Sequence, residues 1–342
     1  MSEFRVDQIT NQSGSRGPDI AGITTFSATS GMLMPSGTTE YRGGRGRGLF
    51  GGGYTFPAPT TNFNIIDYVT IATLGNALDF GDLAQQGTNN SIGACASSTR
   101  GVWGGGSEEP STNSNVIQFV TISSTGNSFD FGDLTFARRS AGACSSSTRG
   151  IWAGGRTPTS QNVIDYITIS TLGNASVFGD LNRGHSSNTS VGACSSPTRG
   201  IFAGGYSPNV NTITFITIAN TGNGQYFGDL TVPRSSGGCC SNLTRGIFAG
   251  GNSTNVIDYF TIASSGNAID FGDLTYSSSQ ISACSNSSRG IFAGGYFAPG
   301  GANIISFVTI ASTGNASDFG DLTQGRAIRN AGCSDAHGGL GD

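Results

Sequence analysis

Four short phrases recur six times each, in a constant order, along most of this chain. One consists of Arg-Gly, an aliphatic residue, an aromatic residue, any residue and Gly-Gly, and it begins at Arg47, Arg100, Arg149, Arg199, Arg245 and Arg289. The other three are a phrase of the form Ile-Asp-Tyr-x-Thr-Ile, in which the Asp and Tyr positions vary, Phe-Gly-Asp-Leu, and a run of small residues around one cysteine. Successive arginines are 53, 49, 50, 46 and 44 residues apart, a spacing typical of β-propeller blades. The sequence therefore predicts six structurally equivalent units.

Each unit is expected to form four short β-strands. The Ile-Asp-Tyr-Ile-Thr-Ile phrase at residues 164–169 is rich in β-branched and aromatic residues, which favour strands. A Gly-Asn pair follows in every unit and suits a type II′ hairpin turn before the Phe-Gly-Asp-Leu strand. The small residues fit an innermost strand, because converging blades leave little room near the axis. The aromatic residue before the double glycine is predicted to pack between neighbouring blades.

The order of the phrases predicts how the ring closes. The first unit begins at the Arg47 phrase without a preceding cysteine strand, and the chain ends on such a strand, Ala331-Gly-Cys-Ser334. The last strand is therefore expected to complete the first blade and to leave no open propeller end. The predicted fold is all-β, a six-bladed propeller over residues 43–342 after a short non-repeat segment, residues 1–42. That segment has too few apolar residues for a core of its own, and we expect it to dock on partners or on its own copies.

The repeat resembles the kelch repeat. Residues 139–144 (Arg-Ser-Ala-Gly-Ala-Cys) and 149–155 (Arg-Gly-Ile-Trp-Ala-Gly-Gly) match the first two kelch strands, which end in a double glycine. Residues 162–169 occupy the place of the tyrosine-bearing third strand. The usual kelch tryptophan after that strand is missing, and the Phe of Phe-Gly-Asp lies near its position. The resemblance covers residues 43–342 and implies a divergent kelch-like propeller.

The sequence of the repeats is similar to that of repeat proteins of marine tailed phages, especially cyanophages. The opening residues 4–14 (Phe-Arg-Val-Asp-Gln-Ile-Thr-Asn-Gln-Ser-Gly) and residues 22–27 also look like the leader of such virion proteins. This resemblance implies a structural or tail-fibre-like protein of the virion, with residues 1–42 contacting other virion proteins or forming a homo-oligomer. A propeller displayed there would serve host recognition by carbohydrate binding or by binding another receptor.

Composition excludes several classes of function. The net charge is −4 and no lysine is present, so the chain has no basic stripe for nucleic acid and no Schiff-base lysine. No run of about 18 apolar residues predicts a membrane span. The first residues are polar and lack the apolar core of a signal peptide, so we expect synthesis in the host cytoplasm before incorporation into the virion.

The loops that follow the double glycines differ from unit to unit, whereas the Thr-Arg-Gly and Gly-Asn turns barely change. Variable loops on a rigid scaffold are common binding sites, and Tyr and Arg are frequent in binding hot spots. The connections between units also vary and carry Arg138, Arg139, Arg183, His185, Arg234, Tyr276, Arg326 and Arg329. The alternative is that these loops vary because nothing constrains them. The predicted ligand-binding residues are Tyr54, Phe56, Glu108, Glu109, Arg156, Tyr206, Tyr296 and Phe297.

No catalytic residue, metal site or cofactor is predicted. Of the seven cysteines, one per unit occupies the same place, so we expect buried free thiols, with Cys240 as the extra residue beside Cys239. Asp-Phe-Gly recurs in phase with the repeat and is therefore scaffold rather than a kinase motif. The arginine of each Thr-Arg-Gly turn is expected to bond loop carbonyls; the alternative is a ring of positive charge that binds a ligand. A calcium site at the Asp of Phe-Gly-Asp would need several converging oxygens.

Three hypotheses for function follow. The first is a virion structural protein, fibre-like or peripheral, whose propeller binds a host-surface glycan or receptor. The second is a purely architectural or decoration protein of the particle. The third, which we disfavour, is an enzyme acting on polysaccharide with a pair of carboxylates.

Overall fold

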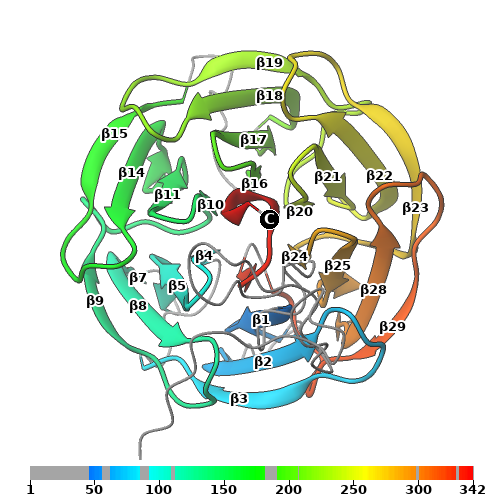
Figure 1. Ribbon diagram of the computed structural model, residues 1–342, viewed down its shortest axis with the longest axis horizontal. Coiled ribbons are helices and arrows are strands. Elements are labelled where there is room, and N and C mark those ends of the chain that lie inside the picture. Colours follow the sequence, from blue (N-terminus) through cyan, green and yellow to red (C-terminus); the bar gives the residue numbers. More distant parts are fainter. Residues whose placement is uncertain are drawn as a thin grey trace, which may run out of the picture. The chain divides into compact units, whose positions relative to one another are not determined.

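The computed structural model describes residues 46–55, 62–84, 92–108, 112–181, 191–206, 208–297, 300–328 and 331–341, with Glu108 and Phe297 described in their backbone alone. The expected attachment segment, residues 1–42, lies outside the described residues. The unit from Gly46 onward is a six-bladed β-propeller, and each blade is an antiparallel four-stranded sheet (Figure 1). The predicted fold class is confirmed.

Each blade is numbered from the axis outward, beginning with the blade that contains Arg47. The innermost strands of blades 1 to 6 are β30 (Gly332–Ser334), β4 (Gly93–Ala96), β10 (Gly142–Ser145), β16 (Gly192–Ser195), β20 (Gly238–Ser241) and β24 (Ser282–Ser285). The second strands are β1 (Arg47–Gly51), β5 (Arg100–Gly104), β11 (Arg149–Ala153), β17 (Arg199–Gly205), β21 (Arg245–Ala249) and β25 (Arg289–Ala293). The third strands are β2 (Ile65–Thr70), β8 (Val116–Thr121), β14 (Val163–Thr168), β18 (Val210–Thr217), β22 (Thr254–Thr261) and β28 (Ile304–Thr309). The outermost strands are β3 (Leu78–Asp82), β9 (Phe129–Asp133), β15 (Ser176–Asp180), β19 (Gln225–Asp229), β23 (Ile269–Ser278) and β29 (Ser317–Asp321).

The two ends of the repeat region meet in blade 1. Strand β30 pairs antiparallel with β1, with Leu49 opposite Cys333 and Gly48 opposite Ser334. Asp335 reinforces this junction, since its Oδ1 accepts hydrogen bonds from the backbone N–H groups of Gly46 (2.6 Å) and Arg47 (2.9 Å). This is the pairing expected from the order of the phrases, and it joins residues that lie almost the whole chain apart.

Small residues line the axis for a packing reason. The cysteine of one blade points its sulfur at the Arg-Gly glycine of the next blade, so that a Cβ added to Gly150 would lie 2.8 Å from the Cys95 Sγ. The same contact joins Cys144 to Gly200, Cys240 to Gly290, Cys284 to Gly48 and Cys333 to Gly101. Cysteine and glycine therefore recur together because the sulfur fills the space that a side chain would take.

The seven cysteines are free and buried, as expected. The prediction that Cys240 is the extra one is wrong. Cys240 lies opposite Ile247, as Cys144 lies opposite Ile151, whereas Cys239 occupies the position of Ala143. Strand register decides this, because two adjacent cysteines fit the repeat equally well in sequence.

The Gly-Asn pairs do not form the expected two-residue hairpins. Residues 71–77 separate β2 from β3, and Gly75-Asn76 lies within this longer connection. The pair instead bonds the previous blade in the ring: in blade 2, the Gly126 N–H donates to the Phe80 carbonyl (2.7 Å) and the Asn127 side chain accepts from the Asp82 N–H (3.0 Å). All six blades repeat the asparagine bond, through Asn76, Asn127, Asn174, Asn223, Asn267 and Asn315.

The aromatic residue of the Arg-Gly phrase packs between blades, as predicted. Trp103 and Trp152 are fully buried, and their indole N–H groups donate to the carbonyls of Ala331 and Gly93 in the preceding blades (3.0 and 3.1 Å). A Cβ on Gly51, the residue before the double glycine, would lie 2.7 Å from the Trp103 indole, so this position is small because the neighbouring ring fills the space.

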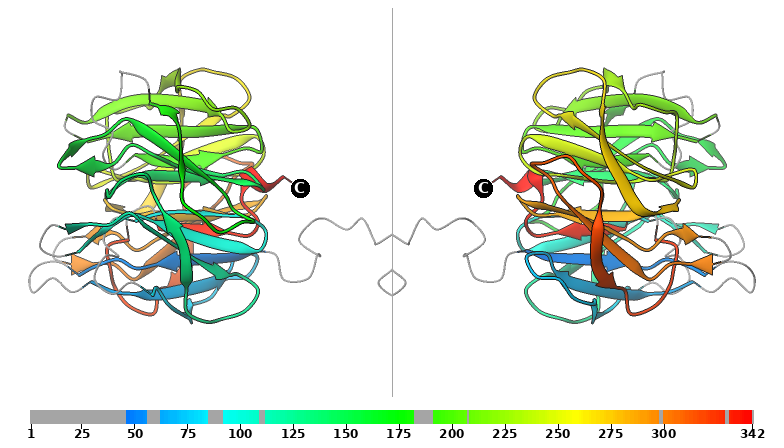
Figure 2. Two further views of the ribbon diagram at one scale, coloured as in Figure 1. Left: turned by 90° about the vertical axis from the view of Figure 1, so that its left-hand side faces the viewer. Right: turned by 90° about the vertical axis from the view of Figure 1, so that its right-hand side faces the viewer.

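The connections divide the propeller into two faces. The turn face carries the connections from first to second and from third to fourth strands, and the loop face carries the others. Three ribbons lie on the loop face: β6 (Ser107–Glu108) with β7 (Thr112–Asn113), β12 (Arg156–Thr157) with β13 (Thr159–Ser160), and β26 (Tyr296–Phe297) with β27 (Gly300–Gly301). A 3-10 helix, η2 (Gly338–Leu340), follows β30 at the turn face. Figure 2 shows the C-terminus on one side and the orange ribbon β26–β27 on the other.

Candidate functional site

The arginines of the Thr-Arg-Gly turns join neighbouring blades. In blade 2, the Arg100 guanidinium stacks 4.8 Å from the Phe119 ring centroid and donates to the Ile169 carbonyl of blade 3 (2.7 Å). Equivalent bonds to the next blade are made by Arg47, Arg149, Arg199, Arg245 and Arg289. The expectation that these side chains bond loop carbonyls is confirmed.

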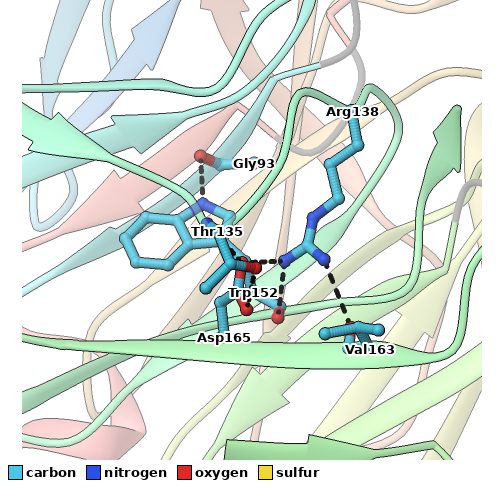
Figure 3. Close-up of polar contacts among 6 residues, drawn as sticks. All are labelled: Gly93, Thr135, Arg138, Trp152, Val163 and Asp165. Carbon is cyan, nitrogen blue, oxygen red and sulfur yellow. Dashed lines mark hydrogen bonds and ion pairs between the residues drawn. The ribbon is translucent and has the colours of Figure 1, made fainter. Parts of the chain in front are cut away.

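Three arginines in the connections between blades are also structural. Arg138 is fully buried and its Nη2 lies 3.0 Å from the Asp165 Oδ2 and 3.2 Å from the Trp152 carbonyl (Figure 3). Thr135 donates to the same carboxylate (2.7 Å). Burial lowers the pKa of Arg138 to about 10, and the charge of Asp165 opposes that shift. Arg234 with Asp258 (2.7 Å) and Arg326 with Asp67 (3.1 Å) repeat the fully buried ion pair. These three arginines are therefore unavailable to a ligand.

The ion pairs fall in alternate blades. Blades 1, 3 and 5 have the aspartate of Ile-Asp-Tyr, whereas blades 2, 4 and 6 have Gln118, Thr214 and Ser306 at that position. Gln118 accepts from the Ser128 hydroxyl (2.7 Å), and Ser306 shares a hydrogen bond with Thr275 (2.6 Å). The sixfold ring therefore has a threefold alternation in its buried polar contacts.

The axial channel is narrow and is occupied at the turn face by the C-terminal residues. Ala, Cys and Ser side chains of the inner strands line it around a volume of about 40 Å³. That volume holds a few waters and no sugar ring. The His337 Nε2 lies 3.0 Å from the Ala96 carbonyl and 3.2 Å from the Ser145 hydroxyl, and its Nδ1 accepts from the Gly339 N–H (3.1 Å). Burial lowers the pKa of His337 to about 4. The imidazole therefore acts as a neutral plug.

The predicted binding residues that the structure describes lie in loop-face connections, but they are spread over five different blades. Tyr206 is 52% exposed and Arg156 is exposed, whereas Tyr54 and Tyr296 are half-buried. The Tyr54 hydroxyl donates to the Gln280 side chain, and the Tyr54 backbone bridges to Ala327. Tyr54 therefore contributes to holding this face together.

Four of the predicted binding residues have no described side chain. Glu108 lies in β6 and Phe297 in β26, each described in its backbone alone. Phe56 and Glu109 lie outside the described residues. Tyr276, which was expected in a connection between blades, lies in the outermost strand β23 and is half-buried; its hydroxyl donates to the Gly294 carbonyl (2.5 Å), and burial raises its pKa.

One of the predicted residues, Arg156, lines a substantial hollow. The blade 2–3 groove has a volume of about 440 Å³ and is formed by Asn113, Ala137, Arg139, Arg156, Thr157 and Pro158. Ligand sites commonly have volumes of about 300–1,000 Å³, so the groove has room for a small ligand or one to two sugar rings. Arg139 and Asn113 were not predicted. The Arg138-Arg139 dipeptide was a signal, but sequence does not tell which arginine is buried.

The groove is built on a backbone bridge between a connection and a loop. The Arg156 N–H donates to the Arg139 carbonyl (2.9 Å), and the Arg139 N–H donates to the Arg156 carbonyl (3.3 Å). Ser140 follows with a positive φ of 60°, which turns the chain sharply into the inner strand β10. The Asn113 side chain of the neighbouring blade donates to the Arg156 carbonyl (3.3 Å). Groups from two blades thus fix the base of the groove.

No protein-family model matches the chain, and no curated protein matches it. In the part of the chain that the structure describes, no group of three or more His, Cys, Asp or Glu side chains is arranged to hold a metal ion. Within the same residues, no helix has the length and apolar character of a membrane span. The assignment of function therefore depends on the faces of the propeller and on the sequence resemblance.

Proposed function

We propose that this protein is a structural component of a tailed-phage particle, fibre-like or peripheral, and that its loop face binds a host-surface glycan. The observation that carries the binding part is the blade 2–3 groove, a hollow of about 440 Å³ on the face whose loops differ between repeats. The virion part is supported by the resemblance of the repeats and of residues 4–14 to marine phage virion proteins.

The contrast in side-chain use supports the choice of face. The repeated Arg, Asn, Cys and Trp side chains already bond or pack against a neighbouring blade, which leaves little of the constant sequence for a ligand. Among the side chains that the structure describes, neither the axial channel nor the groove is lined by a carboxylate, which favours binding over glycoside hydrolysis, a reaction that requires a pair of them.

A purely architectural role is the second candidate, and the outer wall favours it. Large apolar side chains on the outermost strands are 56–67% exposed: Leu78, Phe129, Val177, Tyr226 and Ile269. They lie at the start of β3, β9, β15, β19 and β23, towards the turn face. Exposed apolar positions of this kind suit contacts with other proteins of a particle.

Gold-labelled antibodies against residues 43–342, imaged on the source particle, test the proposal. We expect label at tail tips or fibre ends. Label over the head or tail tube would favour the architectural role, and particles without any label would contradict a virion location. Retention of residues 43–342 on glycans from the host surface then separates binding from display alone.

A further inference from the structure

The blade 2–3 groove carries two arginines that face the same side of a short sheet. Residues directly opposite each other in an antiparallel bridge point to the same face, with Cα atoms about 5.5 Å apart when both backbone bonds form. Arg139 and Arg156 are such a pair, and both line the groove. Like charges in this arrangement repel one another, so an anion between them would relieve the repulsion.

Equivalent bridges elsewhere on the loop face do not have this charge. In blade 6 the bridge joins Ser279 to Tyr296, and in blade 1 it joins Ala327 to Tyr54. The backbone construction therefore requires no arginine at either position. The arginine pair is a property of the groove rather than of the fold.

The two guanidinium groups are partly oriented. The Arg156 Nε donates to the Pro158 carbonyl (2.9 Å), which fixes the plane of its guanidinium and directs its terminal nitrogens away from that carbonyl. Arg139 is half-buried at the base of the groove, and Asn113 and Thr157 add neutral polar groups. Guanidinium forks match the geometry of carboxylate, sulfate and phosphate groups.

We propose that the blade 2–3 groove binds an anionic group carried on a saccharide, a carboxylate or a sulfate or phosphate ester, held between Arg139 and Arg156. This inference rests on the proposed glycan-binding function and names its ligand class. Pro158 and Ala137 supply the apolar surface that the face of a sugar ring contacts.

Isothermal titration of the full chain with matched tetrasaccharides tests this inference. The probes are tetragalacturonate, its fully methyl-esterified form, which has the same sugars without charge, and inorganic sulfate. We expect the acid to bind at least about tenfold more tightly than the ester, since a hydrogen-bonded charge pair is lost in the ester. Raising the NaCl concentration from about 20 mM to about 500 mM should weaken binding, because the groove is open to solvent. Sulfate binding without tetragalacturonate binding would mean that the site takes a free anion, and would overturn the saccharide assignment.

Variants separate the groove from the rest of the face. R139Q/R156Q should lose at least about tenfold in affinity for the acid, and R139K/R156K should lie between that variant and the wild type. N209Q, in the exposed blade 4 loop of the same face and outside the groove, is the control and should bind like the wild type. An unchanged melting temperature shows that each variant is folded.

The outcomes distinguish this inference from the proposed function. Equal binding of acid and ester, or full binding by R139Q/R156Q, would overturn the anionic site while leaving glycan binding in place. Wild-type protein that binds neither anionic probe would overturn the inference. Failure to bind any host-surface glycan would overturn the proposed function as well.

Discussion

The turn face and the loop face are built from the same six repeats but use them differently. On the turn face, each arginine and asparagine of the repeat bonds an adjacent blade, so that a substitution in one unit also removes a contact of its neighbour. On the loop face, equivalent positions hold Arg156, Tyr296 and Tyr54 on the same backbone bridge. The ring thus constrains one face strongly and leaves the other free to vary, which makes the loop face the place where a specific ligand site can arise.

Removal of β30, the strand that closes the ring, should destabilise the propeller more than any other change proposed here. Deletion of residues 324–342 removes β30, Asp335 and Arg326 and leaves the Asp67 carboxylate buried without its ion pair. We expect loss of the cooperative melting transition and aggregation, measured by calorimetry and size-exclusion chromatography. Deletion of Gly341 and Asp342 alone is the control. A truncated protein that melts like the full chain would contradict closure by the C-terminal strand.

Two adjacent arginines sharpen the comparison of the two roles. Arg138→Met leaves Asp165 buried without its partner and should lower the free energy of unfolding by about 3–5 kcal/mol. Arg139→Met removes a groove residue and should change it by less than about 0.5 kcal/mol. Urea titrations of both variants measure this difference. In the double variant R138M/D165L, most of the lost stability should return; equal effects of the two single variants would refute the assignment.

The contact between cysteine and glycine is a smaller test of the scaffold. Gly150→Ala places a Cβ 2.8 Å from the Cys95 Sγ and should destabilise the protein by about 1–3 kcal/mol through overpacking. Cys95→Ala removes the sulfur, so the double variant should be more stable than the sum of the two single changes predicts. Denaturant unfolding of the four proteins in this cycle gives the coupling. Strictly additive effects would mean that the two residues do not compete for one space.

Acid should destabilise the propeller through His337, which lies at the turn-face end of the axial channel. The folded pKa of His337, about 4, lies below the ordinary histidine pKa of 6.5, so the folded state disfavours protonation. Stability from the neutral imidazole is complete above pH 6.5 and is lost as the pH falls towards 4. Protonation also places a hydrogen on Nδ1, which accepts from the Gly339 N–H. We expect the free energy of unfolding to fall by about 1–2 kcal/mol across this range. The side chain is partly exposed, and solvent reduces the size of the effect.

The readout is a difference between two proteins, so that pH effects common to both cancel. His337→Gln has no titrating group at this position, and its free energy of unfolding should fall less steeply between pH 6.5 and pH 4 than that of the wild type. Parallel pH profiles would show that His337 does not contribute.

The smallest effect is expected on the loop face itself. Tyr206 is 52% exposed, and Tyr206→Ser should change the free energy of unfolding by less than about 0.5 kcal/mol. Thermal melting measures this. A large destabilisation would mean that the variable loops support the ring.

Much of the fold could be predicted because each strand is specified locally and then repeated. Six copies of a phrase such as Arg149 to Gly155 reveal the number of blades, and the cysteine strand at the C-terminus reveals the closure. The Gly-Asn turn was predicted incorrectly because its bonds run to another blade, and local turn preferences contain no information about that neighbour. The extra cysteine was assigned to the wrong position for a similar reason, because only the register of β20 against β21 distinguishes Cys239 from Cys240.

The candidate site could be predicted only in part. Variation between repeats pointed to the loop-face connections and included Arg156, which lines the groove, but Arg139 was not chosen although it is adjacent to Arg138 in the sequence. The structure buries one and leaves the other in the groove, according to which way each side chain points from the connection. Tyrosines were favoured for their general frequency in binding sites, yet the Tyr54 hydroxyl is used to bond Gln280.

By itself, the sequence determined that the chain forms six antiparallel blades with small residues at the axis, since hydrophobic pattern, repeat period and residue size are local properties. Only the tertiary structure decided which polar side chains form bonds between blades and which remain accessible to a ligand. The physical reason is that burial, ion pairing and the facing of Arg139 with Arg156 depend on residues brought together by the ring, not on their neighbours along the chain.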